Sequence, residues 1–161
     1  MMKVKTFNCG QPLKDMDMPR ICGIELKSSE AILVVVESTN GIDTLIDTKP
    51  NKISIGDDED NSEVKSFFNS IVAFIRNNHI DVIVLKKRAR KGKMAGGSVS
   101  FKLESLIQIN GIVDTMFVSG QAIAAAHKKG HFETPKILNK YQKTAFMAAA
   151  LYIRKNTQND D

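Results

Sequence analysis

The hydrophobic period of the chain first changes near residue 56. Before this point, apolar and β-branched residues dominate three runs, at 20–27, 30–38 and within 42–55. Only Ser28 and Ser29 separate the first two runs, which is typical of a hairpin. Asn40-Gly41 precedes the third run and suits the positive φ angles of a type I′ turn. This part of the chain therefore predicts three consecutive antiparallel strands.

Beyond residue 56, helical and strand-like periods alternate. Apolar residues recur at spacings of three and four after Ser62, a residue type that caps helices. A short apolar run at 80–85 is typical of a strand buried on both faces, as in a parallel sheet. The remaining predicted elements are a helix over 97–109, a strand over 112–119, a short helix that begins at Ser119, and a last helix over 135–155 opened by Thr134-Pro135.

The predicted order is thus β-β-β-α-β-α-β-α-α. Three antiparallel strands followed by alternating helices and strands favour an α/β fold, with a mixed five-stranded sheet and helices on both faces. A chain of 161 residues is long enough for one such domain. We expect the domain to span residues 20–155, after an irregular N-terminal extension at 1–19 and before a frayed tail at 156–161.

Composition argues against several classes of protein. No apolar run approaches the roughly 20 residues that a transmembrane helix needs, and the N-terminus lacks the apolar centre of a secretory signal. We therefore expect a cytoplasmic protein without membrane contact. Cys9 and Cys22 are too few for a disulfide framework or a four-ligand zinc site. The formal net charge of +5 is compatible with a polyanionic partner.

A basic turn after the 80–85 strand is the strongest local feature. Residues 86–93 contain six cations, namely Lys86, Lys87, Arg88, Arg90, Lys91 and Lys93. Gly96 and Gly97 would let the backbone approach a phosphate, the helix that follows would add unpaired N–H groups, and Lys102 extends the basic surface. Ligands gather at the carboxyl ends of strands in open α/β sheets. The turn therefore predicts sequence-independent contact with nucleic-acid phosphates, although a solvated basic loop has the same composition.

Several motifs resemble those of the ribonuclease H-like superfamily, which includes Holliday-junction resolvases of the RuvC and YqgF kind. "CGIEL" (22–26) is similar to the first strand of these enzymes, with Glu25 at the place of its acidic residue. "DVIVLKKR" (81–88) resembles their fourth strand, and "TAFMAAAL" (144–151) resembles the final helix of the resolvases. "ICGIELKSSEAI" and "KGKMAGGSVSFKLESLIQ" are also similar to an uncharacterised bacterial family. The resemblance covers roughly residues 20–150 and implies the ribonuclease H-like fold.

The resemblance implies nuclease activity only if the acidic residues are present. Nucleases of this superfamily hold two divalent ions with clustered carboxylates, and Mg²⁺ requires such oxygen ligands. Glu25 would be one metal ligand, but Lys87 stands at the fourth-strand position and Thr144 at the final-helix position. Glu104 and Asp114 could replace missing acids, although a Glu on a helix face is more often solvated. Glu25 could equally point outward, or pair with Lys87.

These residues support three hypotheses. The first is a non-catalytic nucleic-acid-binding protein on a ribonuclease H-like scaffold, which needs no cofactor and holds DNA or RNA phosphates with the basic turn. The second is an enzyme, a Mg²⁺- or Mn²⁺-dependent nuclease that uses Glu25 and Glu104. The third is an interaction module for a protein partner or a homodimer, with the antiparallel edge strands and the alanine-rich last helix as its surfaces. The sequence favours the first hypothesis over an enzyme.

Overall fold

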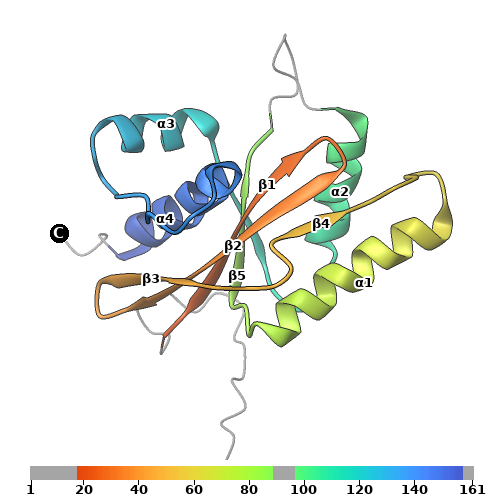
Figure 1. The fold of residues 1–161 in the computed structure, drawn as a ribbon, viewed down its shortest axis with the longest axis horizontal. Coiled ribbons are helices and arrows are strands. Elements are labelled where there is room, and N and C mark those ends of the chain that lie inside the picture. Colours follow the sequence, from red (N-terminus) through yellow and green to blue (C-terminus); the bar gives the residue numbers. More distant parts are fainter. Residues whose placement is uncertain (1–17, 89–96, 158–161) are drawn as a thin grey trace, which may run out of the picture.

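The computed structural model describes residues 18–88 and 97–157, which form one mixed sheet between two pairs of helices (Figure 1). The strands are β1 (Arg20–Lys27), β2 (Glu30–Thr39), β3 (Ile42–Ile46), β4 (Lys52–Ser54), β5 (Val82–Lys86) and β6 (Thr115–Val118). The helices are α1 (Asn61–Asn77), α2 (Ser98–Gln108), α3 (Gly120–Lys128), the 3₁₀ turn η2 (Lys140–Gln142) and α4 (Lys143–Thr157). This order confirms the predicted succession of elements.

The sheet has the strand order β3-β2-β1-β5-β6, and β4 also pairs with β2. β2 is antiparallel to β1, β3 and β4, whereas β5 and β6 run parallel to β1. Asn40 and Gly41 have φ angles of 52° and 78°, as the type I′ turn requires. The expected third strand is divided into β3 and β4, so the sheet has six strands rather than five. Pro50 lies between them, and a proline has no N–H to donate to a strand ladder.

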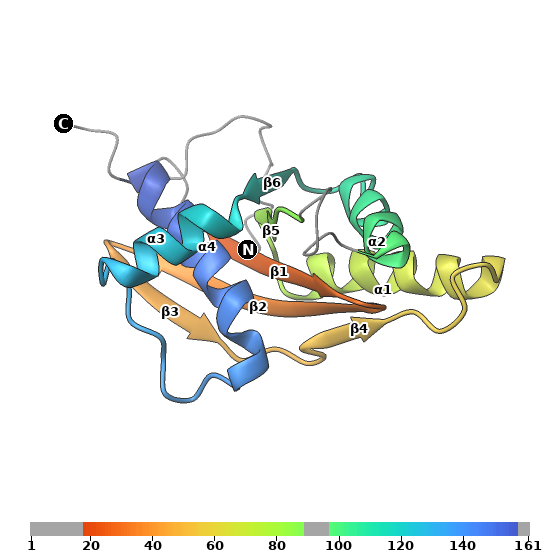
Figure 2. The same cartoon turned by 90° about the horizontal axis from the view of Figure 1, so that it is seen from above.

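Alternating side chains of the strands build two separate cores, one on each face of the sheet. Figure 2 shows the arrangement of the helices around this sheet. α3 and α4 cover the face that carries Ile21, Val34 and Val84. α1 and α2 cover the opposite face, which carries Ile24 and Leu85 among others. A strand buried on both sides must be apolar throughout, which is why the 80–85 run is continuous. Neighbouring residues of β1 and β5 therefore belong to different faces of the sheet.

Two helices do not begin where the sequence predicts: α1 begins earlier and α4 begins later. The N-cap of α1 is Asp60 rather than Ser62, and the Asp60 carboxylate accepts hydrogen bonds from Ser62 N at 2.8 Å and Ser62 Oγ at 2.7 Å. These hydrogen bonds lower the pKa of Asp60. The last helix begins at Lys143 rather than Pro135, because Asn139 forms a capping box with Gln142.

α4 lies unusually close to β1, at Gly23. A Cβ atom at this position would be 2.0 Å from the backbone oxygen of Ala145 and 3.1 Å from Ala149 Cβ. Ala145, Ala148 and Ala149 are fully buried against the sheet. The alanine-rich segment is thus the inner face of the helix, and its prediction as an interaction surface is wrong. Its small side chains allow close approach within the chain.

None of the helices in the described ranges combines the length and the hydropathy that a membrane span requires.

Candidate functional site

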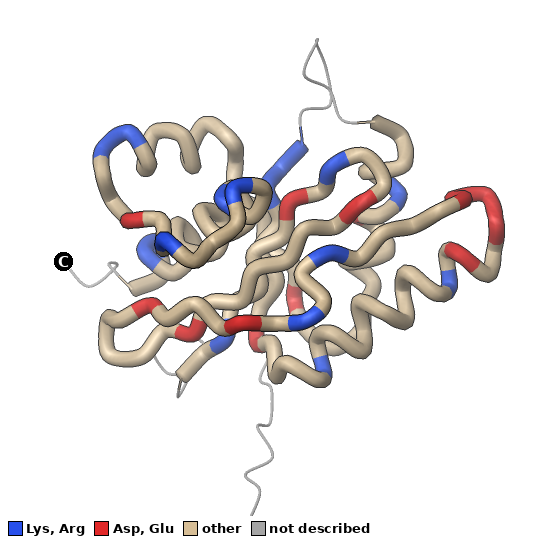
Figure 3. Tube along the Cα trace, in the orientation of Figure 1, with Lys and Arg blue, Asp and Glu red and all other residues tan. Residues whose placement is uncertain are grey.

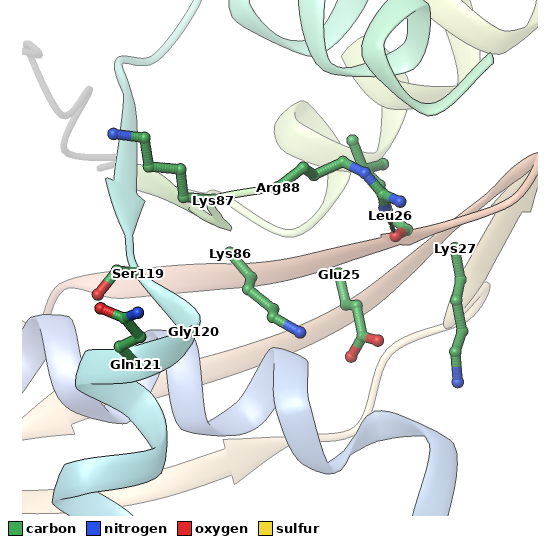
Figure 4. A pocket seen from close by; sticks show the side chains of 9 residues that line it. All are labelled: Glu25, Leu26, Lys27, Lys86, Lys87, Arg88, Ser119, Gly120 and Gln121. Atoms are coloured by element: carbon green, nitrogen blue, oxygen red, sulfur yellow. Dashed lines mark hydrogen bonds between the residues drawn. The ribbon is translucent and has the colours of Figure 1, made fainter. Parts of the chain in front are cut away.

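A pocket of about 510 Å³ lies where β1 and β5 end at the same edge of the sheet (Figure 4). The edge is shared because the two strands are parallel, and α3 begins there because β6 is parallel to β5. The lining residues are Glu25, Leu26, Lys27, Lys86, Lys87, Arg88, Ser119, Gly120 and Gln121. Strand ends and a helix N-terminus thus meet in one concave site, which is the usual place for a ligand in an open α/β sheet.

Glu25 and Lys86 share one face of the sheet at this edge. Ile24 of β1 pairs with Leu85 of β5, and both side chains lie in the core beneath α1 and α2. The next residue of each strand must point to the other face, toward α4. Figure 4 shows the Glu25 and Lys86 side chains on this common side, both half-buried. No hydrogen bond or ion pair between described residues joins them.

The cation beside Glu25 is therefore Lys86, and the expectation that Lys87 lies there is wrong by one residue. The Lys87 side chain is exposed and points away from Glu25 (Figure 4). Its backbone N–H continues the sheet ladder and donates to Val118 O at 2.7 Å. Strand alternation explains the difference, because adjacent residues face opposite sides.

Arg88 is held across the end of β1. Its Nη1 donates to the backbone oxygen of Leu26, which directs the guanidinium along this edge. Its Nε is buried and has no hydrogen-bond partner in the described part of the chain. Lys27 is exposed at the end of the same strand. The edge therefore presents donors from the ends of both strands.

The first turn of α3 forms the remaining wall. Ser119 is its N-cap, and the Ser119 Oγ accepts from Ala122 N at 3.0 Å, as predicted for a helix that begins here. The N–H groups of Gly120 and Gln121 precede the first intrahelical hydrogen bond, so they add partial positive charge. A Cβ atom at Gly120 would lie 3.2 Å from Lys86 Cε. Glycine at this position thus leaves room for the lysine side chain.

The pocket is strongly basic. In the described part of the chain, its charged lining residues are four cations, Lys27, Lys86, Lys87 and Arg88, and one carboxylate, Glu25, for a formal charge of 4 − 1 = +3. Figure 3 shows basic segments at the end of β5 and at the turn between β1 and β2. Among the described residues, no group of three or more His, Cys, Asp or Glu is placed to hold a metal ion. This arrangement is suited to binding an anion.

The other candidate acids are not in the pocket. Glu104 is only 8% exposed, so it is not the solvated helix residue that its position would favour. It belongs to α2, which covers the face opposite the Glu25 side chain. Asp114 precedes β6 and lies at the amino end of that strand, whereas the pocket lies at its carboxyl end. The structure therefore does not bring Glu25, Glu104 and Asp114 together.

The predicted basic surface divides into parts. Lys86, Lys87 and Arg88 line the pocket, whereas the Lys102 Nζ binds Asp58, at 2.6 Å from its backbone oxygen and 3.1 Å from Oδ2. Gly97 is the N-cap of α2. Arg90, Lys91, Lys93 and Gly96 lie outside the described residues.

Sequence reasoning missed Lys27, Ser119, Gly120 and Gln121. A signal was available, because parallel strands end at the same edge of a sheet. A helix that directly follows one of them therefore begins beside the ends of its neighbours. Applying this rule to the 112–119 strand would have placed Ser119 and the next two residues beside the basic turn. Lys27 directly follows the buried part of the first strand.

Comparison with solved structures identifies the fold. Thermus thermophilus RuvC is similar over 86% of this chain and 97% of its own, with a TM-score of 0.65 and 12% sequence identity. The yeast mitochondrial Holliday junction resolvase Ydc2 is similar over 90% of this chain and 82% of its own, with a TM-score of 0.56 and 11% identity. These likenesses confirm the predicted ribonuclease H-like fold.

Sequence comparison gives the family. No curated protein matches the chain. The model of a family described as "Protein of unknown function (DUF3010)" matches residues 18–152. Because this match covers most of the 161 residues, the chain belongs to the DUF3010 family.

Proposed function

We propose that this protein binds nucleic acid through its phosphates and does not cut it. The observation that supports the proposal is the position of Lys86, which lies beside Glu25 where the parallel strands β1 and β5 end. A two-metal nuclease needs clustered carboxylates, and an ammonium group cannot be a ligand of Mg²⁺. The same ammonium is well suited to a phosphate.

The composition of the pocket favours contact with phosphates over reading of bases. No aromatic side chain is among its described lining residues, which therefore offer no platform for base stacking. Its cations and helix N–H groups are the groups that usually contact phosphate oxygens. The solved structures of similar fold include T. thermophilus RuvC in complex with Holliday junction substrate. Branched DNA therefore belongs among the ligands to be tested, together with single strands, duplexes and RNA.

Binding should weaken steeply with salt. If the protein neutralises about three to four phosphates, the affinity for a single strand should fall about 40- to 150-fold between about 50 and 300 mM salt. Fluorescence anisotropy of labelled oligonucleotides, with Mg²⁺ present and the strands checked for integrity on a denaturing gel, measures both properties. No binding at the lowest salt, or binding that salt leaves unchanged, would contradict the proposal.

Glu25→Gln separates this proposal from the nuclease hypothesis. The substitution removes the one carboxylate of the basic lining, so phosphate affinity should rise several-fold. A nuclease that uses Glu25 as a metal ligand would instead cut the wild-type strand in Mg²⁺ or Mn²⁺ and lose this activity on substitution. The two readouts are anisotropy and gel analysis of the same samples. Cutting by the wild type that Glu25→Gln abolishes would refute the non-catalytic proposal.

A further inference from the structure

Two cations of the basic pocket, Lys86 and Arg88, are constrained by their surroundings. Lys86 is half-buried, and its side chain runs against the first turn of α3, with Cε 3.2 Å from the place of a Gly120 Cβ. Arg88 is anchored through its hydrogen bond to Leu26 O. Donors that are already positioned lose little conformational entropy when an anion binds. The pocket is therefore better built than a loop of free lysines to hold one particular anionic group.

Arg88 is a second constrained cation of the pocket lining. Its Nε is buried without a hydrogen-bond partner among the described residues, so an anion in the pocket would bind the other N–H groups of the guanidinium. The same guanidinium lines the pocket. An oxygen acceptor bound there would give this edge of the site a charge-assisted hydrogen bond.

The charge of the lining matches a terminal phosphate better than a backbone phosphate. A phosphodiester carries one negative charge and two free oxygens, with chain continuing on both sides. A phosphate monoester carries a charge of about −1.5 to −2 near neutral pH and has three free oxygens. The lining has a formal charge of +3, with the contribution of Glu25 included. Lys86 and Arg88 lie at and just after the end of β5, and the first N–H groups belong to α3, so the oxygens of one phosphate can be contacted from two sides.

We infer that this pocket binds a phosphate monoester, either the terminal phosphate of a nucleic-acid strand or the phosphate of a free nucleotide. The volume of about 510 Å³ is within the range of pockets that hold small ligands, so part of the attached nucleoside fits as well. Where the phosphate monoester belongs to a nucleic-acid strand, the inference rests on the proposed function. It then adds recognition of the strand end to contact with the backbone.

The experiment uses one short single strand with an internal fluorophore, prepared with a 5′-phosphate, with a 3′-phosphate or with hydroxyl groups at both ends. Adenosine monophosphate and adenosine serve as unlabelled competitors. The full chain is compared with Lys86→Met, which keeps a stem of similar length and removes the charge. Lys102→Met is the matched control, because Lys102 pairs with Asp58 outside the pocket. Thermal unfolding confirms that each variant is folded, and Lys86→Gln provides a second test of the same site.

A terminal phosphate at one of the two ends should raise the affinity of the wild type and of Lys102→Met about tenfold or more. Lys86→Met should lose this preference, and adenosine monophosphate should compete where adenosine does not. If no oligonucleotide binds but adenosine monophosphate binds directly in isothermal titration calorimetry and adenosine does not, the monoester site stands with a free nucleotide as its ligand, and the proposed function fails. If all strands bind equally, the inference is overturned while the proposed function stands. If neither strands nor nucleotide bind, both are overturned.

Discussion

Gly23→Ala should lower the free energy of unfolding by about 3 kcal/mol, although alanine is normally at least as well tolerated as glycine in a strand. The added methyl group would lie 2.0 Å from the backbone oxygen of Ala145 and 3.0 Å from its carbonyl carbon. A backbone carbonyl cannot rotate away as a side chain can, so α4 would have to move off the sheet. That movement would open the core that Ile21, Val34 and Val84 form with this helix.

The loss would be a large fraction of the total stability of a typical domain, which is about 5–15 kcal/mol. Chemical denaturation followed by circular dichroism measures it. Gly97→Ala is the control, because a Cβ atom at Gly97 would meet no described atom within 4 Å and its φ of −69° is open to alanine. We expect that control to change stability by less than about 1 kcal/mol.

A second variant tests the backbone origin of the effect. Ala149→Gly removes the only side-chain atom among the three nearest to the added methyl group, but it leaves the Ala145 carbonyl in place. Combining it with Gly23→Ala should therefore not restore stability. A Gly23→Ala protein as stable as the wild type, or a full rescue by Ala149→Gly, would mean that α4 does not approach β1 as closely as described.

Lys86→Glu should lower the affinity for nucleic acid by at least about 30-fold at low salt. The substitution replaces the ammonium beside Glu25 with a second carboxylate on the same face, and it changes the formal charge of the pocket lining from +3 to +1. The dependence of affinity on salt should also become shallower, because fewer phosphates are neutralised. Anisotropy titrations at several salt concentrations measure the affinity and its slope together.

Lys102→Glu is the matched control for that experiment. It changes the net charge of the protein by the same amount, but the Lys102 side chain binds Asp58 and does not line the pocket. We expect it to change affinity only a few-fold. Equal losses in both variants would show that binding depends on overall charge, and the pocket would then have no special part in it.

Much of the fold follows from local sequence patterns. The Asn40-Gly41 turn and the change of hydrophobic period are short-range features, and they predicted the order of the strands and helices correctly. Cys22 is buried in the first strand, and this burial raises the pKa of its thiol well above the ordinary range. Element boundaries were less accurate, because Asp60 and Asn139 compete with nearby residues that also cap helices.

The sequence by itself determined that the basic turn follows a buried strand and that only one of the expected acids, Glu25, is present. Which cation stands beside Glu25 was decided by the tertiary structure. The pairing of Ile24 with Leu85 joins residues about 60 positions apart, and a shift of one residue exchanges Lys86 for Lys87. The wall of the pocket that the first turn of α3 forms, from Ser119 to Gln121, also depends on the long-range pairing of β5 with β6. Glu104 is separated from Glu25 by the sheet, because its helix α2 covers the face opposite the Glu25 side chain.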